Sequence, residues 1–250
     1  MAIVTETSQK PTLVFLPGAW HTPECFEKVM AQLKALGYPT TTTQLPSVGG
    51  KVSTTMTDDA AHINKFLSQL VDDGKDVVLI MHSYSGIPGT ESVKGLAKKD
   101  RQAAGLPGGI VALVYIAAFL LPQGQSLVSF LGSMPDWVIF DGDRLTVETG
   151  PAVFYNDLPS DTAEYWSSKL QHHAWPSFNT PLSYPAYQHV PSTYLFCEQD
   201  MAIPLPGQKA MASFAGEGLK THTCTASHSP MLSMLELVVN VIRGAAGEAI

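Results

Sequence analysis

The feature of this sequence that most constrains its fold is the alternation of short apolar runs with longer segments of helical periodicity. The run Asp76–Met81 is apolar after its first residue, and Gly109–Phe119 is continuously apolar. Cys25–Leu36 instead places apolar residues three and four positions apart, which is typical of an amphipathic helix. Uninterrupted apolar strands separated by helices favour a parallel sheet covered on both faces. We therefore predict an α/β fold with a doubly wound, mostly parallel sheet of about six strands.

Both ends of the chain carry this pattern, which indicates that they belong to one core. Further strands are predicted at Thr12–Leu16, Thr40–Leu45, Ser192–Cys197 and Leu219–Thr223. Thr57, followed by two aspartates, is predicted to cap a helix that ends at Gly74. Another helical pattern runs to about Lys99, and a last helix opens at Ser229-Pro230 and continues through Ile242. We assign residues 1–121 and 190–250 to this core.

The middle of the chain breaks the alternation. Residues 122–189 are rich in aromatic residues, prolines and short helical fragments. A stretch this long without structure would be unusual in a compact domain, so we predict that it forms a small helical cap inserted between two strands. A cap rich in aromatic side chains above the carboxyl edge of the sheet would enclose an apolar pocket. The aromatics could equally serve only to attach the cap to the core.

Composition excludes several classes of protein. The chain has 250 residues, 15 of them basic and 22 acidic, and its net charge of −7 argues against a nucleic-acid binder. The three cysteines share no metal-type spacing, so neither a disulfide framework nor a metal site is predicted. Met1–Lys10 lacks the apolar core of a signal peptide, and Ile110–Leu121 is too short to cross a bilayer. We expect a cytoplasmic protein without a membrane partner, either a monomer or a homodimer.

The strongest chemical signal is the segment Val77–Gly86, in which a buried strand ends at Ser83 and turns at once into a helix. Such a turn exposes the serine hydroxyl at the top of the sheet and points the first amides of the helix at the same place. The usual pattern for this turn is G-x-S-x-G. Ser85 is a small replacement for the second glycine, whereas Met81 replaces the first glycine with a bulky side chain, so the packing there must differ. We predict that Ser83 is a nucleophile.

A serine nucleophile needs a general base and an acid that orients it. Asp200 follows the strand Ser192–Cys197, and Glu198 is its local rival. His228 lies in the loop between the last strand and the final helix, where a base can reach Ser83. The order serine, aspartate, histidine along the chain is the one expected for such a sheet. We predict Ser83, Asp200 and His228 as the catalytic residues.

Acyl transfer also requires amide donors for the oxyanion. We predict that Tyr84, directly after the nucleophile, supplies one donor and that Ala19 supplies the other, because Gly18 lets the backbone bend close to the substrate. His21 and His82 flank the site in sequence, and we predict no catalytic role for either. The residues predicted to contact substrate are Trp20, His21, Phe119, Trp137, Phe154 and Trp175.

These motifs resemble those of the α/β-hydrolases, in particular the small-cap branch of methylesterases and hydroxynitrile lyases. Phe15–His21 is similar to the H-G-A-x-H opening of that branch, with Pro17 in place of histidine. Met81–Gly86 is similar to its G-H-S-x-G-G turn, and Ser227–Pro230 to its histidine loop. The resemblance covers nearly the whole chain, without the first two strands of larger members.

The resemblance implies hydrolysis of an ester through Ser83, Asp200 and His228 without a cofactor. The lyases of the branch carry threonine at the position of Ala19 and lysine at that of Ser229, so their absence argues against cyanohydrin cleavage. We expect a small, largely apolar or aromatic carboxylic ester or lactone as substrate. Two alternatives remain open on the same scaffold: a lyase, cyclase, isomerase or C–C hydrolase, and a hydrolase-like receptor for a small ligand.

Overall fold

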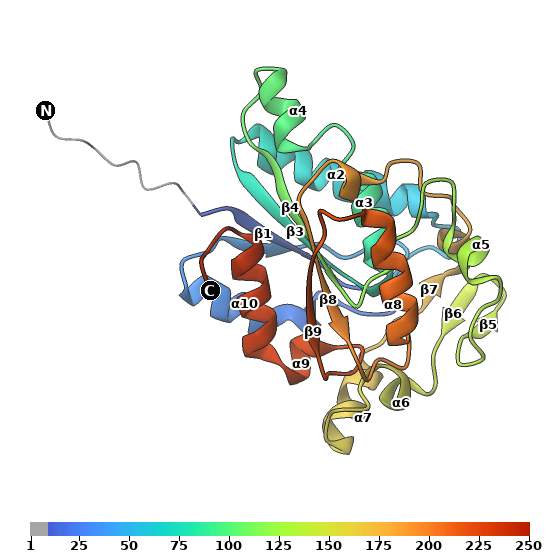
Figure 1. Cartoon of the computed structure of the whole chain (residues 1–250). Coiled ribbons are helices and arrows are strands. Elements are labelled where there is room, and N and C mark those ends of the chain that lie inside the picture. The colour runs from blue at the N-terminus through green and yellow to red at the C-terminus, as the bar shows by residue number, and fades with distance from the viewer. Residues whose placement is uncertain (1–9) are drawn as a thin grey trace, which may run out of the picture.

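A computed structural model describes residues 10–250 and shows a single central sheet of six parallel strands (Figure 1). The strand order is β2-β1-β3-β4-β8-β9, and every neighbouring pair is parallel. The predicted α/β fold is therefore confirmed. The strands are β1 (Thr12–Leu16), β2 (Thr40–Thr42), β3 (Asp76–His82), β4 (Gly109–Ile116), β8 (Ser192–Cys197) and β9 (Lys220–Cys224).

Helices cover both faces of this sheet, as its continuously apolar strands require. On β3, Val78 and Ile80 face a layer formed by α1 (Glu27–Ala35) and α10 (Leu235–Ala245). The alternate residues of the strand pack against the opposite layer. That layer comprises α2 (Met56–Asp72), α3 (Gly86–Ser92) and α8 (Leu205–Ala212), and Figure 1 shows these helices on the other side of the sheet from α10.

Several further helices are short. Among them are the α-helices α4 (Lys98–Ala103), which precedes β4, and α9 (Pro230–Ser233), which precedes α10. The 3-10 helices are η1 (Pro23–Phe26), η2 (Ser83–Ser85), η3 (Trp175–Phe178), η4 (Ala186–Gln188) and η5 (Ser213–Ala215). Within residues 10–250, no helix is both long enough and apolar enough to cross a bilayer.

The segment between β4 and β8 contains short helices and also a small antiparallel sheet, β5-β6-β7, which the sequence did not predict. Its strands have only two or three residues, too few for an alternating pattern to be visible. An isolated bridge between Val48 and His173 ties this sheet to the core. The elements are α5 (Leu127–Leu131), β5 (Ile139–Asp141), β6 (Arg144–Thr146), α6 (Gly150–Phe154), α7 (Ser160–Ser168) and β7 (His173–Ala174).

Several element boundaries differ from the prediction. The cap of α2 is Thr55, whose hydroxyl accepts from the Asp58 amide in a reciprocal capping box, rather than Thr57. The helical pattern after Ser83 is interrupted at Gly95, which has a φ of +80°. The last helix is broken at Met234 into α9 and α10.

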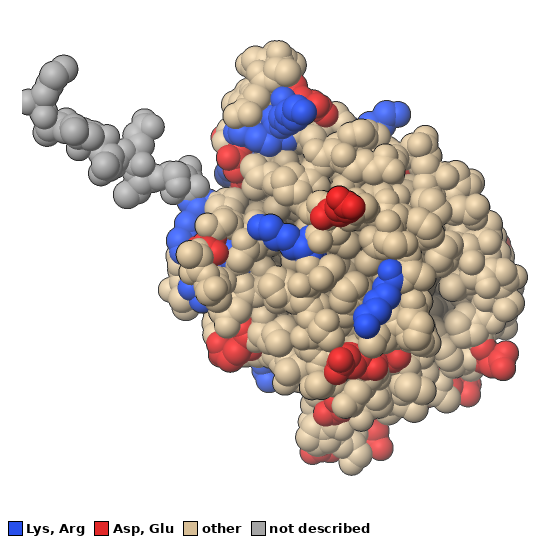
Figure 2. All heavy atoms as spheres, in the orientation of Figure 1, with Lys and Arg blue, Asp and Glu red and all other residues tan. Residues whose placement is uncertain are grey.

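On the face shown in Figure 2, charged side chains are scattered among uncharged ones.

Candidate active site

Ser83 lies on a strained turn directly after β3. Its φ of +56° belongs to the left-handed region, which is costly for a residue with a side chain. Gly18 makes the turn possible, because a Cβ atom there would lie 2.7 Å from the Cβ of Ser83. Ser85 stabilises it, since its hydroxyl donates to the Leu16 carbonyl (2.8 Å) and accepts from the His82 amide (2.9 Å). The serine at the second glycine position of the motif thus joins β1 to the turn.

Met81, the bulky departure from the motif, is accommodated by a glycine on the following helix. Gly89 of α3 faces the Met81 side chain, and a Cβ atom at Gly89 would lie 2.6 Å from its sulfur. Both residues are buried. The extra volume on β3 is therefore matched by a missing side chain on α3, and the turn at Ser83 keeps its shape.

Asp200 and His228 are brought together at the carboxyl edge of the sheet, on the loops after β8 and β9. Nδ1 of His228 donates to Oδ2 of Asp200 at 2.8 Å, and both side chains are almost completely buried. The other carboxylate oxygen accepts the amides of Ala202 and Ile203, each at 2.8 Å. These bonds fix the carboxylate, which in turn fixes the tautomer and orientation of the ring.

With its proton on Nδ1, His228 presents Nε2 as a proton acceptor. Nε2 is buried and has no hydrogen-bond partner among the residues that the structure describes. Ser83 Oγ is not hydrogen-bonded to it here, and such bonds often form only when substrate is bound. The arrangement leaves a basic nitrogen without competition from another donor.

His21 and His82 lie beside His228 as neutral rings, with centroids 6.5 Å and 4.7 Å from its ring. Burial lowers the pKa of His21 to about 4 and holds the pKa of His82 well below its usual value. His82 Nε2 donates to the backbone carbonyl of His228 at 2.9 Å. Nδ1 of His21 lies 2.7 Å from the carbonyl of Ala19, and Nε2 lies 3.0 Å from the hydroxyl of Tyr155. Both histidines therefore hold neighbouring groups in place.

The two predicted oxyanion donors lie close to Ser83. Ala19 and Tyr84 both line the cavity that Ser83 also lines. Within residues 10–250, neither backbone N–H donates to another group of the chain. Trp20 follows Ala19 in the turn after β1 and has a φ of +64°. Its indole N–H donates to the carbonyl of Leu145 at 3.1 Å. Two free amides beside a serine hydroxyl are suited to binding an anionic oxygen.

The sequence did not reveal a buried carboxyl group behind Tyr84. Asp59 of α2 is completely buried and accepts the Tyr84 hydroxyl (3.2 Å) together with the Ser47 amide (2.9 Å) and hydroxyl (2.6 Å). Burial raises the pKa of Asp59 to about 6. The sequence groups Asp58 and Asp59 with Thr57 in the predicted helix cap, but of the two aspartates only Asp58 takes part in the capping box. No local signal separates the two.

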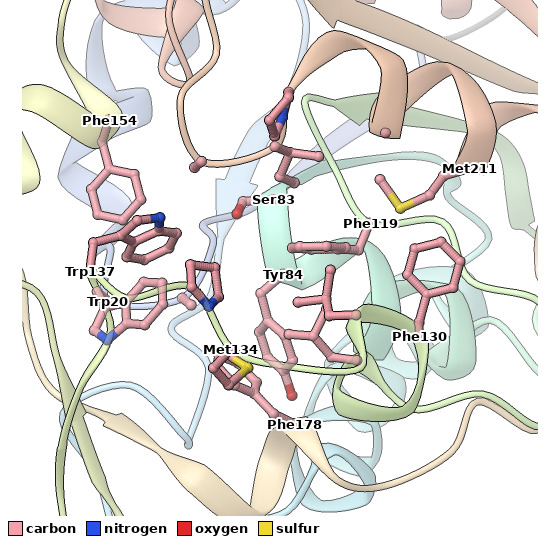
Figure 3. A pocket seen from close by; sticks show the side chains of 18 residues that line it. Trp20, Ser83, Tyr84, Phe119, Phe130, Met134, Trp137, Phe154, Phe178 and Met211 are labelled. Carbon is pink, nitrogen blue, oxygen red and sulfur yellow. The ribbon is translucent and has the colours of Figure 1, made fainter.

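A small apolar cavity opens above Ser83. Its volume is about 130 Å³, and none of its lining residues is charged. Figure 3 shows Trp20, Trp137 and Phe154 on one side of Ser83, and Phe119, Phe130 and Met211 on the other. Four of the predicted contact residues thus line the cavity: Trp20, Phe119, Trp137 and Phe154.

His21 and Trp175, also predicted to contact substrate, do not line this cavity. His21 lies behind Ala19, where its two nitrogens are engaged. Trp175 is partly buried and packs against Phe140 and Phe178, with ring centroids 5.0 Å and 6.4 Å away.

The prediction also missed two groups of lining residues. One comes from α5 and the loop after it, and includes Leu127, Phe130 and Met134; the other comes from the loop after Asp200 and from α8, and includes Ile203 and Met211. Their apolar character is visible in the sequence, but the sequence does not show which of these side chains face Ser83.

In the described part of the chain, no three His, Cys, Asp or Glu side chains gather to form a metal site.

This fold and motif geometry define an α/β-hydrolase, and the chain belongs to the alpha/beta hydrolase family, whose pattern it matches over residues 13–241. It is similar to the alpha/beta hydrolase nvfD of Aspergillus novofumigatus, with 34% identity over 96% of this chain and 98% of that one. It is also similar to methylesterase 7 of Arabidopsis thaliana, with 25% identity over 91% and 93% of the two chains.

Among solved structures, a pyrethroid hydrolase from Sphingobium faniae superposes with a TM-score of 0.74. The sequences are 20% identical, and the match covers 94% of this chain and 97% of that one. The similarity in structure is one of fold. The predicted resemblance to the methylesterase-like branch is confirmed by the methylesterase relative.

Proposed function

We propose that this protein is a serine hydrolase that cleaves a small, uncharged, largely apolar or aromatic carboxylic ester or lactone. The observation that carries the proposal is the state of His228, whose Nδ1 is bound to Asp200 while Nε2 is free. A base held in this tautomer is what a serine nucleophile requires. The strained backbone of Ser83, at the floor of an apolar cavity, supports the same function.

In the proposed mechanism, Ser83 Oγ attacks the ester carbonyl carbon while His228 Nε2 takes the hydroxyl proton. The carbonyl oxygen becomes an oxyanion that accepts the amides of Ala19 and Tyr84, and Asp200 stabilises the imidazolium. The C–O bond to the alcohol then breaks, and His228 returns the proton to the departing oxygen. Water attacks the resulting acyl-enzyme, with His228 again taking and returning a proton, and the carboxylic acid leaves.

The lining of the cavity supports an uncharged substrate. A carboxylate or ammonium group placed among Phe119, Trp137 and Phe154 would lose its hydration without gaining a partner, which is costly. A cavity of about 130 Å³ is also small, so we infer that a bulky substrate would extend past its mouth. In this proposal, residues 122–189 act as the cap, which supplies eight of the 18 residues that line the cavity.

The unusual Met81 gives no reason to prefer a different reaction. A changed packing at Met81 would favour the lyase, cyclase or C–C hydrolase alternatives only if it altered the turn, and Gly89 accommodates the side chain beside a Ser83 that keeps its left-handed backbone. A receptor function would require a ligand-dependent partner and slow turnover. Steady-state hydrolysis of esters measures that turnover directly.

The test is steady-state hydrolysis of p-nitrophenyl esters of increasing acyl length, with Ser83→Ala, His228→Gln and Asp200→Asn beside the parent protein. Ser213→Ala, an exposed serine far along the chain from the turn, is the matched control. We expect the three site variants to lose at least about 1,000-fold in kcat and the control to keep its rate. A fluorophosphonate should add its mass at Ser83 in the parent only. Equal rates for Ser83→Ala and parent would refute the mechanism, and no ester turnover in either would favour the alternatives.

A further inference from the structure

One short segment, residues 154–157, joins the inserted region to both loops that carry the predicted acid and base. The Asp157 carboxylate accepts the backbone amide of Ser227 at 2.9 Å and also the hydroxyl of that residue. Ser227 is completely buried and directly precedes His228. Next to Asp157, the Asn156 side-chain amide donates to the carbonyl of Gln199 at 3.1 Å, one residue before Asp200.

The loop that carries His228 has few other anchors. The amide of Gln199 donates to the carbonyl of Ala226 at 3.1 Å, which links the two loops to each other. His82 holds the carbonyl of His228 from the side of β3. Asp157 supplies charge-assisted bonds to Ser227 from the inserted region rather than from the sheet core.

The same segment also reaches the cavity. Phe154, at its start, lines the cavity wall, and its ring centroid lies 5.5 Å from that of His228. A carbonyl of this residue lies 3.1 Å from the Ser227 hydroxyl. A substrate that contacts Phe154 in the cavity therefore contacts the segment that binds Ser227, the residue directly before His228.

From these contacts we infer that Asp157 is a positioning residue, which aligns His228 with the nucleophile by fixing Ser227 and thereby couples occupation of the cavity to the position of the base. The inference rests on the proposed serine-hydrolase function. Misplacement of a catalytic group by about 1 Å can cost about 100-fold in rate, so two bonds one residue away from the base are enough to matter. A coupling of this kind raises kcat for substrates that fill the cavity, because their binding energy is used to align the base.

The test compares Asp157→Ala, Asp157→Asn and Ser227→Ala, with the double variant of Asp157→Ala and Ser227→Ala. Asp161→Asn is the matched control, because that carboxylate lies in the same region and, among residues 10–250, bonds only its neighbour Thr162. Active sites are counted by complete titration with a fluorophosphonate, so that a misfolded fraction does not enter kcat. Thermal unfolding is recorded for each protein.

We expect Asp157→Ala to lower kcat per titrated site by about 10- to 100-fold, with KM changed less than about threefold. Asp157→Asn, which keeps one oxygen acceptor, should recover a large part of the loss. The gain in kcat from short to cavity-filling acyl groups should shrink in Asp157→Ala, and the double variant should lose less than the product of the single losses.

Unchanged kcat per site in Asp157→Ala, or a loss equal to that of Asp161→Asn, would overturn the inference while the proposed function stands. A loss confined to KM or to the number of titrated sites would overturn it too, because that is what a merely structural role predicts. Failure of the proposed function looks different, since the parent protein would then show no Ser83-dependent turnover at all.

Discussion

The side chain of Met81 on β3 lies directly against Gly89 on α3, so the bulky residue on the strand faces a residue without a side chain on the helix. A Cβ atom at Gly89 would come within 2.6 Å of the methionine sulfur and 3.1 Å of Leu16 Cδ1. A glycine inside a helix normally costs about 1 kcal/mol relative to alanine. Here it leaves space for the side chain of Met81, which stands where the motif of the turn at Ser83 usually has glycine.

Gly89→Ala is therefore expected to destabilise the protein by about 1–3 kcal/mol despite its better helix propensity, because the buried methyl has no room. Met81→Ala should cost about 2–5 kcal/mol by leaving a cavity. In the double variant the new methyl partly fills that cavity, so the loss should be smaller than the sum of the two. Urea unfolding of the four proteins measures this, and additive losses would show that the two residues do not share the space.

Gly18→Ala should disturb the nucleophile more than the fold. The added Cβ would lie 2.7 Å from Ser83 Cβ and 3.1 Å from the carbonyl of His82, so either Ser83 or the turn after β1 must move. We expect kcat/KM for p-nitrophenyl esters to fall by about 100-fold or more. Gly218→Ala is the control, because a Cβ atom there would meet no atom of the described residues within 4 Å. If both variants kept the parent rate, the close approach of Gly18 to Ser83 would be irrelevant to function.

Because the carboxyl group of Asp59 is buried and its pKa is raised, we expect an unusual dependence of protein stability on pH. Its pKa in the folded protein is raised from 3.8 to about 6, so between these values the folded protein keeps a proton that the unfolded chain has lost. The contribution of this group to stability therefore falls as pH rises from about 4 to 6 and is constant above that range. Relative to Asp59→Asn, the parent protein should lose ~2–3 kcal/mol of unfolding free energy between pH 4 and 7.

Urea unfolding of both proteins across this range provides the measurement. The buried His21 and His173, whose pKa values are lowered to about 4 and about 3, change stability in the opposite direction. They do so in both proteins, so the difference between the two curves isolates the carboxyl group. Parallel curves would mean that Asp59 has an ordinary pKa in the folded protein.

Trp137 and Trp175 offer a paired test of which aromatics bound the cavity. Trp137 lines it and packs edge-on against Trp20, with ring centroids 5.7 Å apart, whereas Trp175 does not line it and packs against Phe140. Trp137→Ala should shift the preference toward longer acyl groups, raising the ratio of kcat/KM for the longest to the shortest ester by about 10-fold or more. Trp175→Ala should leave that ratio unchanged. A shift in Trp175→Ala alone would place the substrate elsewhere.

Much of the fold was predictable because it depends on local patterns. Continuously apolar strands such as Asp76–Met81 can only be buried on both faces, which requires a parallel sheet with two helical layers. The strand-to-helix turn at Ser83 is visible in the sequence for the same reason. The two- and three-residue strands β5, β6 and β7 were not predicted, because elements so short have no measurable periodicity.

By itself, the sequence determined the class of fold and the three residues predicted to carry the chemistry, since their positions follow from where strands end. Only the tertiary structure decided which side chains meet. It separated the capping Asp58 from the buried Asp59, paired Met81 with Gly89, and placed Asp157 on Ser227. Each of these depends on the direction of a side chain and on a contact between distant segments, which residue spacing along one chain does not encode.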